Sequence, residues 1–281
     1  MKVVTTIEET TSIITSLQSS NKTIGLTPTM GALHEGHLSL IQKSCKQNEI
    51  SIVTIFVNPT QFDKKEDLIN YPSSYNSDIK LLENTSCDYV FAPKPSEMYQ
   101  QDIEAETFTF DGLENEMEGK FRNNHFDGVG TIVKKFFQII KPSKAYFGEK
   151  DFQQLQIIKK MTTKEMFPVE IIGCPIFRES DGLAMSSRNA RLSENQRQAA
   201  PLIFEILKKV KDQFKTKSIL EINSWVSDRF KESSTLTLEY FEIADESTLK
   251  TISKRDNQKK HRAFIAVYAD KIRLIDNISL Q

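Results

Sequence analysis

A chain of 281 residues is expected to form one main domain with a smaller companion. Its residues are 38% hydrophobic and 27% charged, which is typical of a folded globular protein. Because 37 Lys and Arg residues balance 38 Asp and Glu residues, the net charge of -1 provides no overall field that would attract nucleic acid or anionic lipid. The longest strongly apolar stretch, residues 52–57, is far too short to cross a membrane.

The first 20 residues contain acidic residues and many Thr and Ser, without the basic start and apolar centre of a secretion signal. The three cysteines, Cys45, Cys87 and Cys174, are widely spaced and form no CxxC pair, so they predict neither a disulfide framework nor a zinc knuckle. Both features predict a cytoplasmic protein. The balanced charge and the short apolar stretches predict that it binds neither nucleic acid nor membranes.

Strands and helices are predicted to alternate as far as residue 176. The sequence indicates strands at residues 23–27, 50–57, 89–92, 145–147 and 169–174, and helices at residues 37–47, 73–84 and 152–165. Six apolar residues with helical spacing predict one buried face of a further helix: Val129, Ile132, Val133, Phe136, Phe137 and Ile140. This alternation predicts an α/β fold over residues 1–176, with a Rossmann-like, mostly parallel sheet and helices on both faces.

The pattern changes after residue 176. Two capping boxes, Ser193 with Gln196 and Ser218 with Glu221, each predict the start of a helix, and the first helix is expected to continue to Phe214. Residues 235–244, 263–269 and 272–275 then indicate strands. Residues 177–281 are therefore expected to form a smaller α+β domain.

Four of the predicted strands are followed by loops rich in polar residues and glycine: residues 27–37, 57–62, 147–154 and 182–188. In an open parallel sheet, ligands bind at the carboxyl ends of the strands. These loops are therefore expected to border one crevice.

The first loop has the composition of an anion site. Gly31 and Gly36 permit close backbone approach, and His34 and His37 lie on the same side of an opening helical turn. Helix amino ends attract phosphate, to which two imidazoles can donate hydrogen bonds. Two other interpretations remain open: the imidazoles cap the helix or pack against it, or they bind zinc, which would need a third protein ligand.

The sequence contains neither GxxxxGK[ST] nor GxGxxG, so a nucleotide site would be of neither the Walker nor the dinucleotide type. Lys150 and Arg188 are candidate cations for phosphate oxygens, and Ser186 and Ser187 add hydroxyl donors. Taken singly, such charged side chains are more often solvated surface groups.

Three neutral amides, Asn58, Gln61 and Gln154, are suited to fixing a small polar substrate. Asn58 precedes a proline and can equally serve in a turn. Asp78 and Glu149 could hold Mg²⁺ together with phosphates, or could be surface carboxylates. For Arg122, His125 and Gly128 the sequence gives no preference between a substrate contact and a structural role.

Several ordered segments can be compared with a known family. They are Pro28-Thr-Met-Gly-Ala-Leu-His-Glu-Gly-His37, Phe56-Val-Asn-Pro59, Gln61-Phe62, His125-Phe126 with Gly128-Val129, Phe147-Gly-Glu-Lys-Asp151 and Met185-Ser-Ser-Arg188, with Leu274-Ile-Asp-Asn277 as a weaker match. Together they resemble the pantothenate synthetases. The HxGH and MSSR segments also resemble nucleotide-binding signatures of class I aminoacyl-tRNA synthetases and related nucleotidylyltransferases.

The resemblance implies a two-step ligase reaction. Pantoate attacks the α-phosphorus of Mg-ATP, and β-alanine then displaces AMP from the pantoyl adenylate. The residues implied to bind ATP are Met30, Gly31, Ala32, Leu33, His34, Glu35, Gly36, His37, Gly148, Glu149, Lys150, Asp151, Phe177, Met185, Ser186, Ser187 and Arg188. His34, His37 and Lys150 would be the catalytic residues.

By the same resemblance, Gln61, Gln154 and Asn58 would bind substrate, and Asp78 would lie near the magnesium ion. The smaller domain would close over the active site, and the protein would be a homodimer. The sequence departs from the family at Thr27, where an apolar residue is usual, and at Thr60, where Met is usual. The second change could alter the fit of the pantoate pocket.

Other functions remain open. A nucleotidylyltransferase with a different acceptor would share the HxGH loop, but Gln61, Gln154 and the HFxGV segment disfavour it. A nucleotide-binding or RNA-binding protein without catalysis is disfavoured by the balanced charge and the lack of a basic stripe. A metal-binding structural protein is the remaining alternative.

Overall fold

The computed structural model describes residues 1–63, 68–69, 71–72, 74–99 and 102–281. The chain divides into two compact units. Unit 1 comprises Met1–Glu114, Glu118–Glu149 and Gln154–Pro175, and unit 2 comprises Asn115–Met117, Lys150–Gln153 and Ile176–Gln281. The domain boundary expected at residue 176, and the closure of one domain over an active site, stay predictions.

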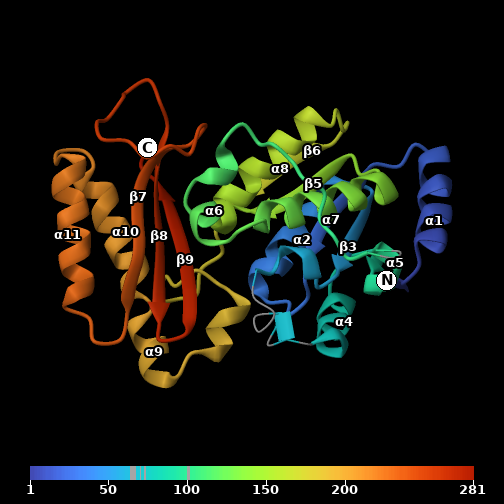
Figure 1. Cartoon of the computed structure of the whole chain (residues 1–281). Coiled ribbons are helices and arrows are strands. Elements are labelled where there is room, and N and C mark those ends of the chain that lie inside the picture. The colour runs from blue at the N-terminus through green and yellow to red at the C-terminus, as the bar shows by residue number, and fades with distance from the viewer. Residues whose placement is uncertain (64–67, 70, 73, 100–101) are drawn as a thin grey trace. The chain divides into compact units, whose positions relative to one another are not determined.

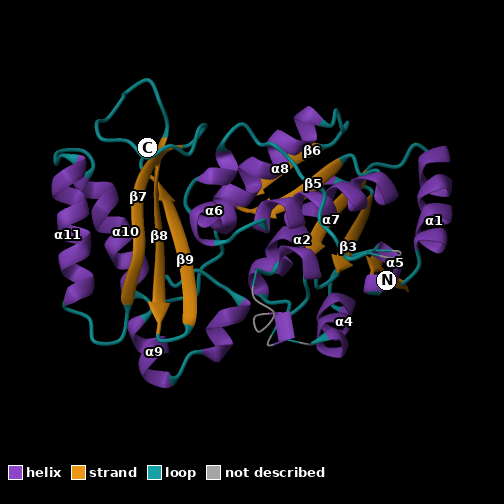
Figure 2. Ribbon diagram, in the orientation of Figure 1, coloured by secondary structure: helices purple, strands orange, loops and turns teal. Residues whose placement is uncertain are grey.

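Unit 1 is built on a six-stranded sheet with the order β1–β4–β3–β2–β5–β6, in which every neighbouring pair is parallel (Figures 1 and 2). The strands are β1 (Lys2–Val4), β2 (Ile24–Thr29), β3 (Ile50–Ile55), β4 (Tyr89–Phe91), β5 (Lys144–Gly148) and β6 (Glu170–Cys174). The α/β class and the parallel sheet predicted from the sequence are confirmed.

The described helices of this part of the chain are α1 (Ile7–Ser19), α2 (Glu35–Gln47), α4 (Tyr75–Glu83), α5 (Pro95–Met98), α6 (Glu118–Phe121), α7 (His125–Ile140) and α8 (Phe152–Lys164), with 3₁₀ turns η1 (Pro59–Gln61), η2 (Leu113–Asn115) and η3 (Glu149–Asp151). Along the chain, β3 and β4 are added to the sheet on one side of β2. The next strands, β5 and β6, are added on the other side of β2. Because such crossovers are right-handed, α2 and α4 cover one face and α7 and α8 the other. The direction changes between β2 and β5, where α/β sheets bind ligands.

Helix α7 supplies the apolar face that the sequence predicts. All six residues of that face are buried, with exposed fractions of 5% or less. The Phe136 ring packs edge-to-face with Phe56 and with Phe91, and the centroid distance is 6.3 Å in both pairs. This face therefore anchors α7, and with it the segment before α7, against the sheet.

The amino-terminal elements differ from the expectation. The sequence did not predict β1 or α1, because Thr and Ser hide the short apolar pattern of which Ile14 is the buried centre. Thr6 caps α1 by accepting a hydrogen bond from the Glu9 amide. Helix α2 begins at Glu35, two residues before the expected start. The start expected for the next helix, residue 73, lies outside the described residues.

Unit 2 contains an antiparallel sheet of β7 (Thr237–Asp245), β8 (His261–Ala269) and β9 (Ile272–Ser279). Helices α10 (Leu202–Gln213) and α11 (Ile219–Lys231) lie together beside this sheet (Figure 1) and share its apolar core. The smaller α+β part expected in the second part of the chain is confirmed, and its sheet is antiparallel. None of the described helices is long and apolar enough to cross a membrane.

Both predicted capping boxes are present, at Ser193 with Gln196 and at Ser218 with Glu221. The single helix expected from Ser193 onward is wrong: α9 (Glu194–Ala199) ends, and α10 begins at Leu202. Pro201 lies between them and has no backbone N–H to continue the helical hydrogen bonds.

Candidate active site

The loop after β2 leads into the amino end of α2. His34 is the residue before the helix and has extended backbone, with φ -147° and ψ 174°. Within the described residues, its side chain is not the cap of α2, and its ring lies against that of His37, with centroids 4.1 Å apart. Two imidazoles therefore lie at the amino end of a 13-residue helix, where backbone N–H groups favour phosphate.

Asp78, on α4, holds the backbone of this loop. Gly31 and Ala32 are both in the left-handed region, with φ of 81° and 50°, which costs an alanine about 1 kcal/mol. Asp78 Oδ2 accepts hydrogen bonds from the Ala32 amide and the Ser74 hydroxyl, both at 2.9 Å, and Oδ1 accepts one from the Leu33 amide at 2.8 Å. Because Asp78 is only 2% exposed, this buried carboxylate stabilises the strained loop.

Among the described residues, no group of three or more His, Cys, Asp or Glu side chains could hold a metal ion. The Asp78 carboxylate already accepts three hydrogen bonds, which leaves it little capacity for a cation. In nucleotide sites Mg²⁺ usually binds phosphate oxygens and waters with only one or two carboxylates. The residues therefore fit an ion carried by a nucleotide better than a metal site built from protein ligands alone.

Gln61, in η1, lies against the same loop. Its Nε2 donates to Met30 Sδ at 3.0 Å, and its backbone oxygen lies 2.8 Å from His125 Nδ1. The Arg122 guanidinium can only donate, so its contact with His125 Nε2 at 3.0 Å places the imidazole proton on Nδ1, facing Gln61. These contacts make His125 and Arg122 supports of the Gln61 backbone, a role that the sequence left open.

Unit 2 brings Lys150, Ser186 and Arg188 to one small cavity, which Asn189, Arg273 and Asp276 also line. Ser186 Oγ accepts a hydrogen bond from the Arg188 amide at 3.2 Å and so begins the turn η4 (Ser187–Arg191). The Lys150 ammonium lies 3.6 Å from an Asp151 carboxylate oxygen. Two cations and a hydroxyl in one cavity are a suitable lining for phosphate oxygens.

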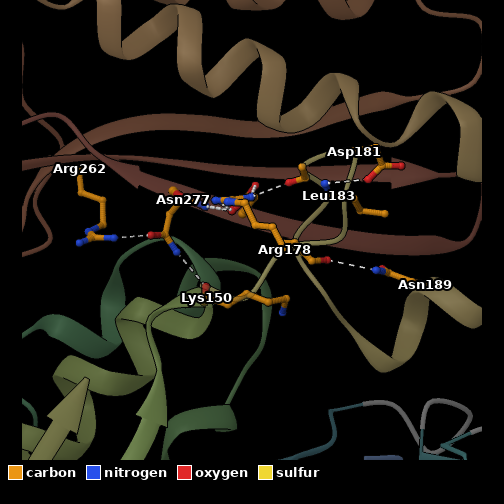
Figure 3. Close-up of polar contacts among 10 residues, drawn as sticks. Lys150, Arg178, Asp181, Leu183, Asn189, Arg262 and Asn277 are labelled. Atoms are coloured by element: carbon orange, nitrogen blue, oxygen red, sulfur yellow. Dashed lines mark hydrogen bonds and ion pairs between the residues drawn. The ribbon is translucent and has the colours of Figure 1, made fainter. Parts of the chain in front are cut away.

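The backbone of Lys150 is tied to β9 (Figure 3). Asn277 Nδ2 donates to the Lys150 carbonyl at 2.9 Å, and the Arg262 guanidinium donates to Asn277 Oδ1 at 2.6 Å. The neighbouring Asp276 accepts two hydrogen bonds from Arg178, at 2.6 and 2.9 Å. Sequence reasoning did not assign these residues, although adjacent Asp and Asn inside a strand were a usable signal.

The remaining predicted residues are divided between the units. Gln154 is partly buried on α8, and Gly148 is the last residue of β5. The side chain of Phe177 is 40% exposed, and its carbonyl accepts a hydrogen bond from the Met185 amide at 3.0 Å. In unit 1, the loop after β2 thus contains Met30 and His34 and leads to His37, and both Gln61 and Asp78 contact this loop. In unit 2, one cavity is lined by Lys150, Ser186 and Arg188. That all of them bind one nucleotide stays a prediction.

A model of the pantoate-beta-alanine ligase family matches residues 2–279 of the chain. The chain belongs to this family. As a pantoate-β-alanine ligase it is an ATP-dependent ligase, which confirms the activity class that the ordered sequence segments predict.

Relatives of this ligase cover nearly its whole length. The pantothenate synthetase of Christiangramia forsetii is 55% identical over 95% of this chain and 95% of that protein, and the one from Bacteroides fragilis is 46% identical over 99% and 98%. A pantothenate synthetase structure from Thermus thermophilus has a TM-score of 0.92 at 34% identity, covering 100% of this chain and 99% of that one. The ligase from Francisella tularensis, complexed with beta-gamma ATP and beta-alanine, has a TM-score of 0.84 at 36% identity, covering 100% and 98%.

Proposed function

We propose that this chain joins pantoate to β-alanine in two steps, through a pantoyl adenylate. In the first step, a carboxylate oxygen of pantoate bonds to the α-phosphorus of ATP, and the bond from that phosphorus to pyrophosphate breaks. In the second step, the neutral amine of β-alanine attacks the acyl carbon, AMP leaves, and the new amide nitrogen loses a proton. The observation that carries this proposal is the His34–His37 pair at the amino end of α2, on the loop that Gln61 contacts.

His34 and His37 are the proposed donors to the phosphate oxygens that gain charge as pyrophosphate leaves. Their rings are already placed side by side, and Asp78 fixes the preceding loop. Donors that need no rearrangement stabilise developing charge more effectively than mobile ones. The loop from Met30 to His37 would therefore bind the phosphates without first becoming ordered.

The proposed phosphate-binding groups of unit 2 are Lys150, Ser186, Ser187 and Arg188. Lys150 would act as a compact charge and Arg188 as a planar fork, and their common cavity supports this assignment. The remaining nucleotide contacts would come from Gly148, Glu149, Asp151, Phe177 and Met185.

Gln61 and Gln154 are the proposed pantoate contacts, and Gln61 would also border β-alanine. Neutral amides can fix the hydroxyl and carboxylate oxygens of pantoate without a full positive charge that would compete with the phosphorus centre for the attacking oxygen. The burial of Gln61, which is 8% exposed, supports a closely fitting contact.

Mg²⁺ would enter with ATP and neutralise phosphate charge, and Asp78, which holds the loop before α2, would lie near it. A cytoplasmic location is supported by the three free thiols at Cys45, Cys87 and Cys174. A homodimer is proposed from the family resemblance, and sedimentation equilibrium at several protein concentrations would test it.

Exchange of labelled pyrophosphate into ATP, measured before any β-alanine is added, tests the proposed first step. We expect exchange only when pantoate is present, because adenylate formation must consume it. Exchange that ignores pantoate would refute pantoate as the acceptor.

A further inference from the structure

The Asn58 side chain is enclosed by hydrogen bonds from the protein. It is 1% exposed, and its Nδ2 lies 3.0 Å from the Gly128 carbonyl oxygen and 3.2 Å from Gln61 Oε1. Its Oδ1 lies 2.6 Å from the Tyr99 hydroxyl and 3.2 Å from the Thr60 hydroxyl. A primary amide offers two hydrogens and two acceptor positions, so these four contacts occupy the whole group. These contacts give Asn58 a role toward its neighbours; the sequence had left a substrate contact and a turn role open for it.

The Gly128 carbonyl is one of the groups that orient the Asn58 amide. A backbone carbonyl only accepts, so the atom that faces it must be Nδ2. The approach of α7 to η1 is fixed as well, because a Cβ on Gly128 would lie 2.4 Å from the Thr60 carbonyl oxygen. The packing of the backbone thus supplies one of the contacts that orient Asn58.

The Asn58 amide in turn sets the orientation of Gln61. Because Nδ2 donates toward Gln61, the atom it meets must be Oε1, and Gln61 Nε2 points the other way with both of its hydrogens. One of these hydrogens goes to Met30 Sδ at 3.0 Å. Gln61 therefore faces the first loop as a donor and not as an acceptor.

Two hydroxyl groups hold Asn58 Oδ1 in its orientation. Tyr99 donates to it at 2.6 Å, and the Thr60 hydroxyl lies within 3.2 Å of Oδ1 and 3.1 Å of the Tyr99 oxygen. Burial raises the pKa of the Tyr99 hydroxyl, so it keeps its proton at neutral pH. Thr60 stands where Met is usual in the resembling family, and a Met side chain has no hydroxyl to donate.

We propose that Thr60 and Tyr99 are positioning residues which, through Asn58, make Gln61 a hydrogen-bond donor to an oxygen of pantoate. This inference rests on the proposed function, in which Gln61 contacts pantoate. Without the hydroxyls, Oδ1 loses its donors in a buried site and only the Gly128 carbonyl still orients the Asn58 amide, so the amides of Asn58 and Gln61 can turn together. A turned Gln61 presents Oε1, which repels a carboxylate oxygen of pantoate instead of donating to it.

The test uses Thr60→Val and Tyr99→Phe, which remove one hydroxyl each with little change of shape. In pantoate-dependent pyrophosphate exchange, we expect each variant to raise the KM for pantoate about five- to tenfold, as the loss of one hydrogen bond predicts. The KM for ATP should stay within about twofold of the wild-type value, because the hydrogen bonds of Asn58 go to none of the residues proposed to bind phosphate. The double variant should show less than the product of the two effects, since both act through one amide.

Thr60→Ser keeps the hydroxyl and should restore the wild-type KM for pantoate. Thr162→Val is the matched control, because the Thr162 hydroxyl is also buried but donates to the Ile158 carbonyl within α8. An unchanged KM for pantoate in both hydroxyl variants, or an equal rise in the KM for ATP, would overturn the inference. If wild-type exchange does not respond to pantoate at all, the proposed function fails instead, and the two failures are distinguishable.

Discussion

The rings of His34 and His37 lie side by side with centroids 4.1 Å apart. His34 is the residue before α2, and His37 lies in the first turn of that helix. Neither residue is fully buried, so neither is a core residue in the way that Leu40 and Ile41 of the same helix are. Their proximity places two N–H donors at one helix terminus. Because both side chains are only partly buried, mutation can test the chemical role of each with little effect on the stability of the fold.

Replacing His37 with alanine should lower pantoate-dependent pyrophosphate exchange by about 100- to 1000-fold, which is typical for the loss of one group that stabilises developing charge. The free energy of unfolding, measured by urea titration, should fall by less than about 1 kcal/mol because the side chain is only partly buried. Ser39→Ala removes a hydroxyl that bonds to the Gly36 carbonyl in the same turn, and serves as the control with near-normal activity. Normal turnover in the His37 variant would remove it from the mechanism.

Replacing Asp78 with asparagine should disturb the loop that contains Gly31 and Ala32. An amide group turns at least one accepting oxygen into a donor that faces the Ala32 or Leu33 amide. We expect a fall of about 1–3 kcal/mol in the free energy of unfolding and about a tenfold rise in the KM for ATP.

The Mg²⁺ concentration that gives half-maximal activity distinguishes the two roles of Asp78. If the carboxylate chiefly holds the loop, this concentration should stay near the wild-type value, and Ser74→Ala should produce a weaker version of the same defects. A large rise in the required Mg²⁺ concentration with unchanged unfolding would instead identify Asp78 as a metal ligand.

Replacing Lys150 with methionine should lower kcat/KM for ATP by about 10- to 100-fold, because a cation that faces phosphate is lost. Stability should change little, since the Asp151 carboxylate that Lys150 contacts at 3.6 Å is 48% exposed and well solvated. Arginine at this position should rescue only in part because its planar group is not equivalent to an ammonium. The control is Lys160→Met, which breaks an exposed pair with Asp111 and should leave kcat/KM unchanged.

Asp245 gives unit 2 a predictable response to acid. Burial opposes the ionisation of Asp245, but hydrogen bonds from Ser247 and Thr248 outweigh burial and bring its pKa to about 2, below the ordinary value of 3.8. A lowered pKa means that this stabilisation is fully present above about pH 4 and is lost as the pH falls toward 2. Asp245→Asn should therefore be less stable at pH 7 by about 2 kcal/mol.

Urea titrations at about pH 7, 4 and 3 would measure this effect. The difference between wild type and Asp245→Asn should shrink between the last two values, because the carboxylate of the unfolded chain, with the ordinary pKa of 3.8, takes up protons there while the native carboxylate, with a pKa of about 2, stays mostly charged. A difference that stays constant down to pH 3 would show that the charge of Asp245 contributes nothing to folding. Asp256→Asn, in an exposed turn, provides the comparison.

The parallel sheet was predictable because each buried strand carries its own signal. Residues 50–55 are apolar and β-branched, and α7 repeats apolar residues with helical spacing. By contrast, β1 has only three residues and takes its place by pairing with β4, a contact between distant parts of the chain. The break at Pro201 was visible in the sequence but was outweighed by the apolar face that continues beyond it.

The candidate site could be predicted where one short segment carries the chemistry, as in residues 34–37. It could not be predicted where a role depends on contacts between distant residues. Asn58 could bind substrate or turn the chain, and only its contacts with Tyr99 and Gly128 show how its amide is used. The hydrogen bonds of His125 likewise reveal a support for Gln61 that spacing alone could not indicate.

Because β2 pairs with both β3 and β5, the part of the sheet where ligands are expected to bind can be completed only after β5 has been synthesised. The β2–β3–β4 hydrogen bonds join residues between positions 24 and 91, so they can form early on the ribosome. The neighbour on the other side, β5, pairs through Gly25 with Lys144 and Leu26 with Ala145. A nascent chain that stalls before residue 144 therefore exposes an unpaired β2 edge, and this is the stage at which a chaperone would protect it from aggregation.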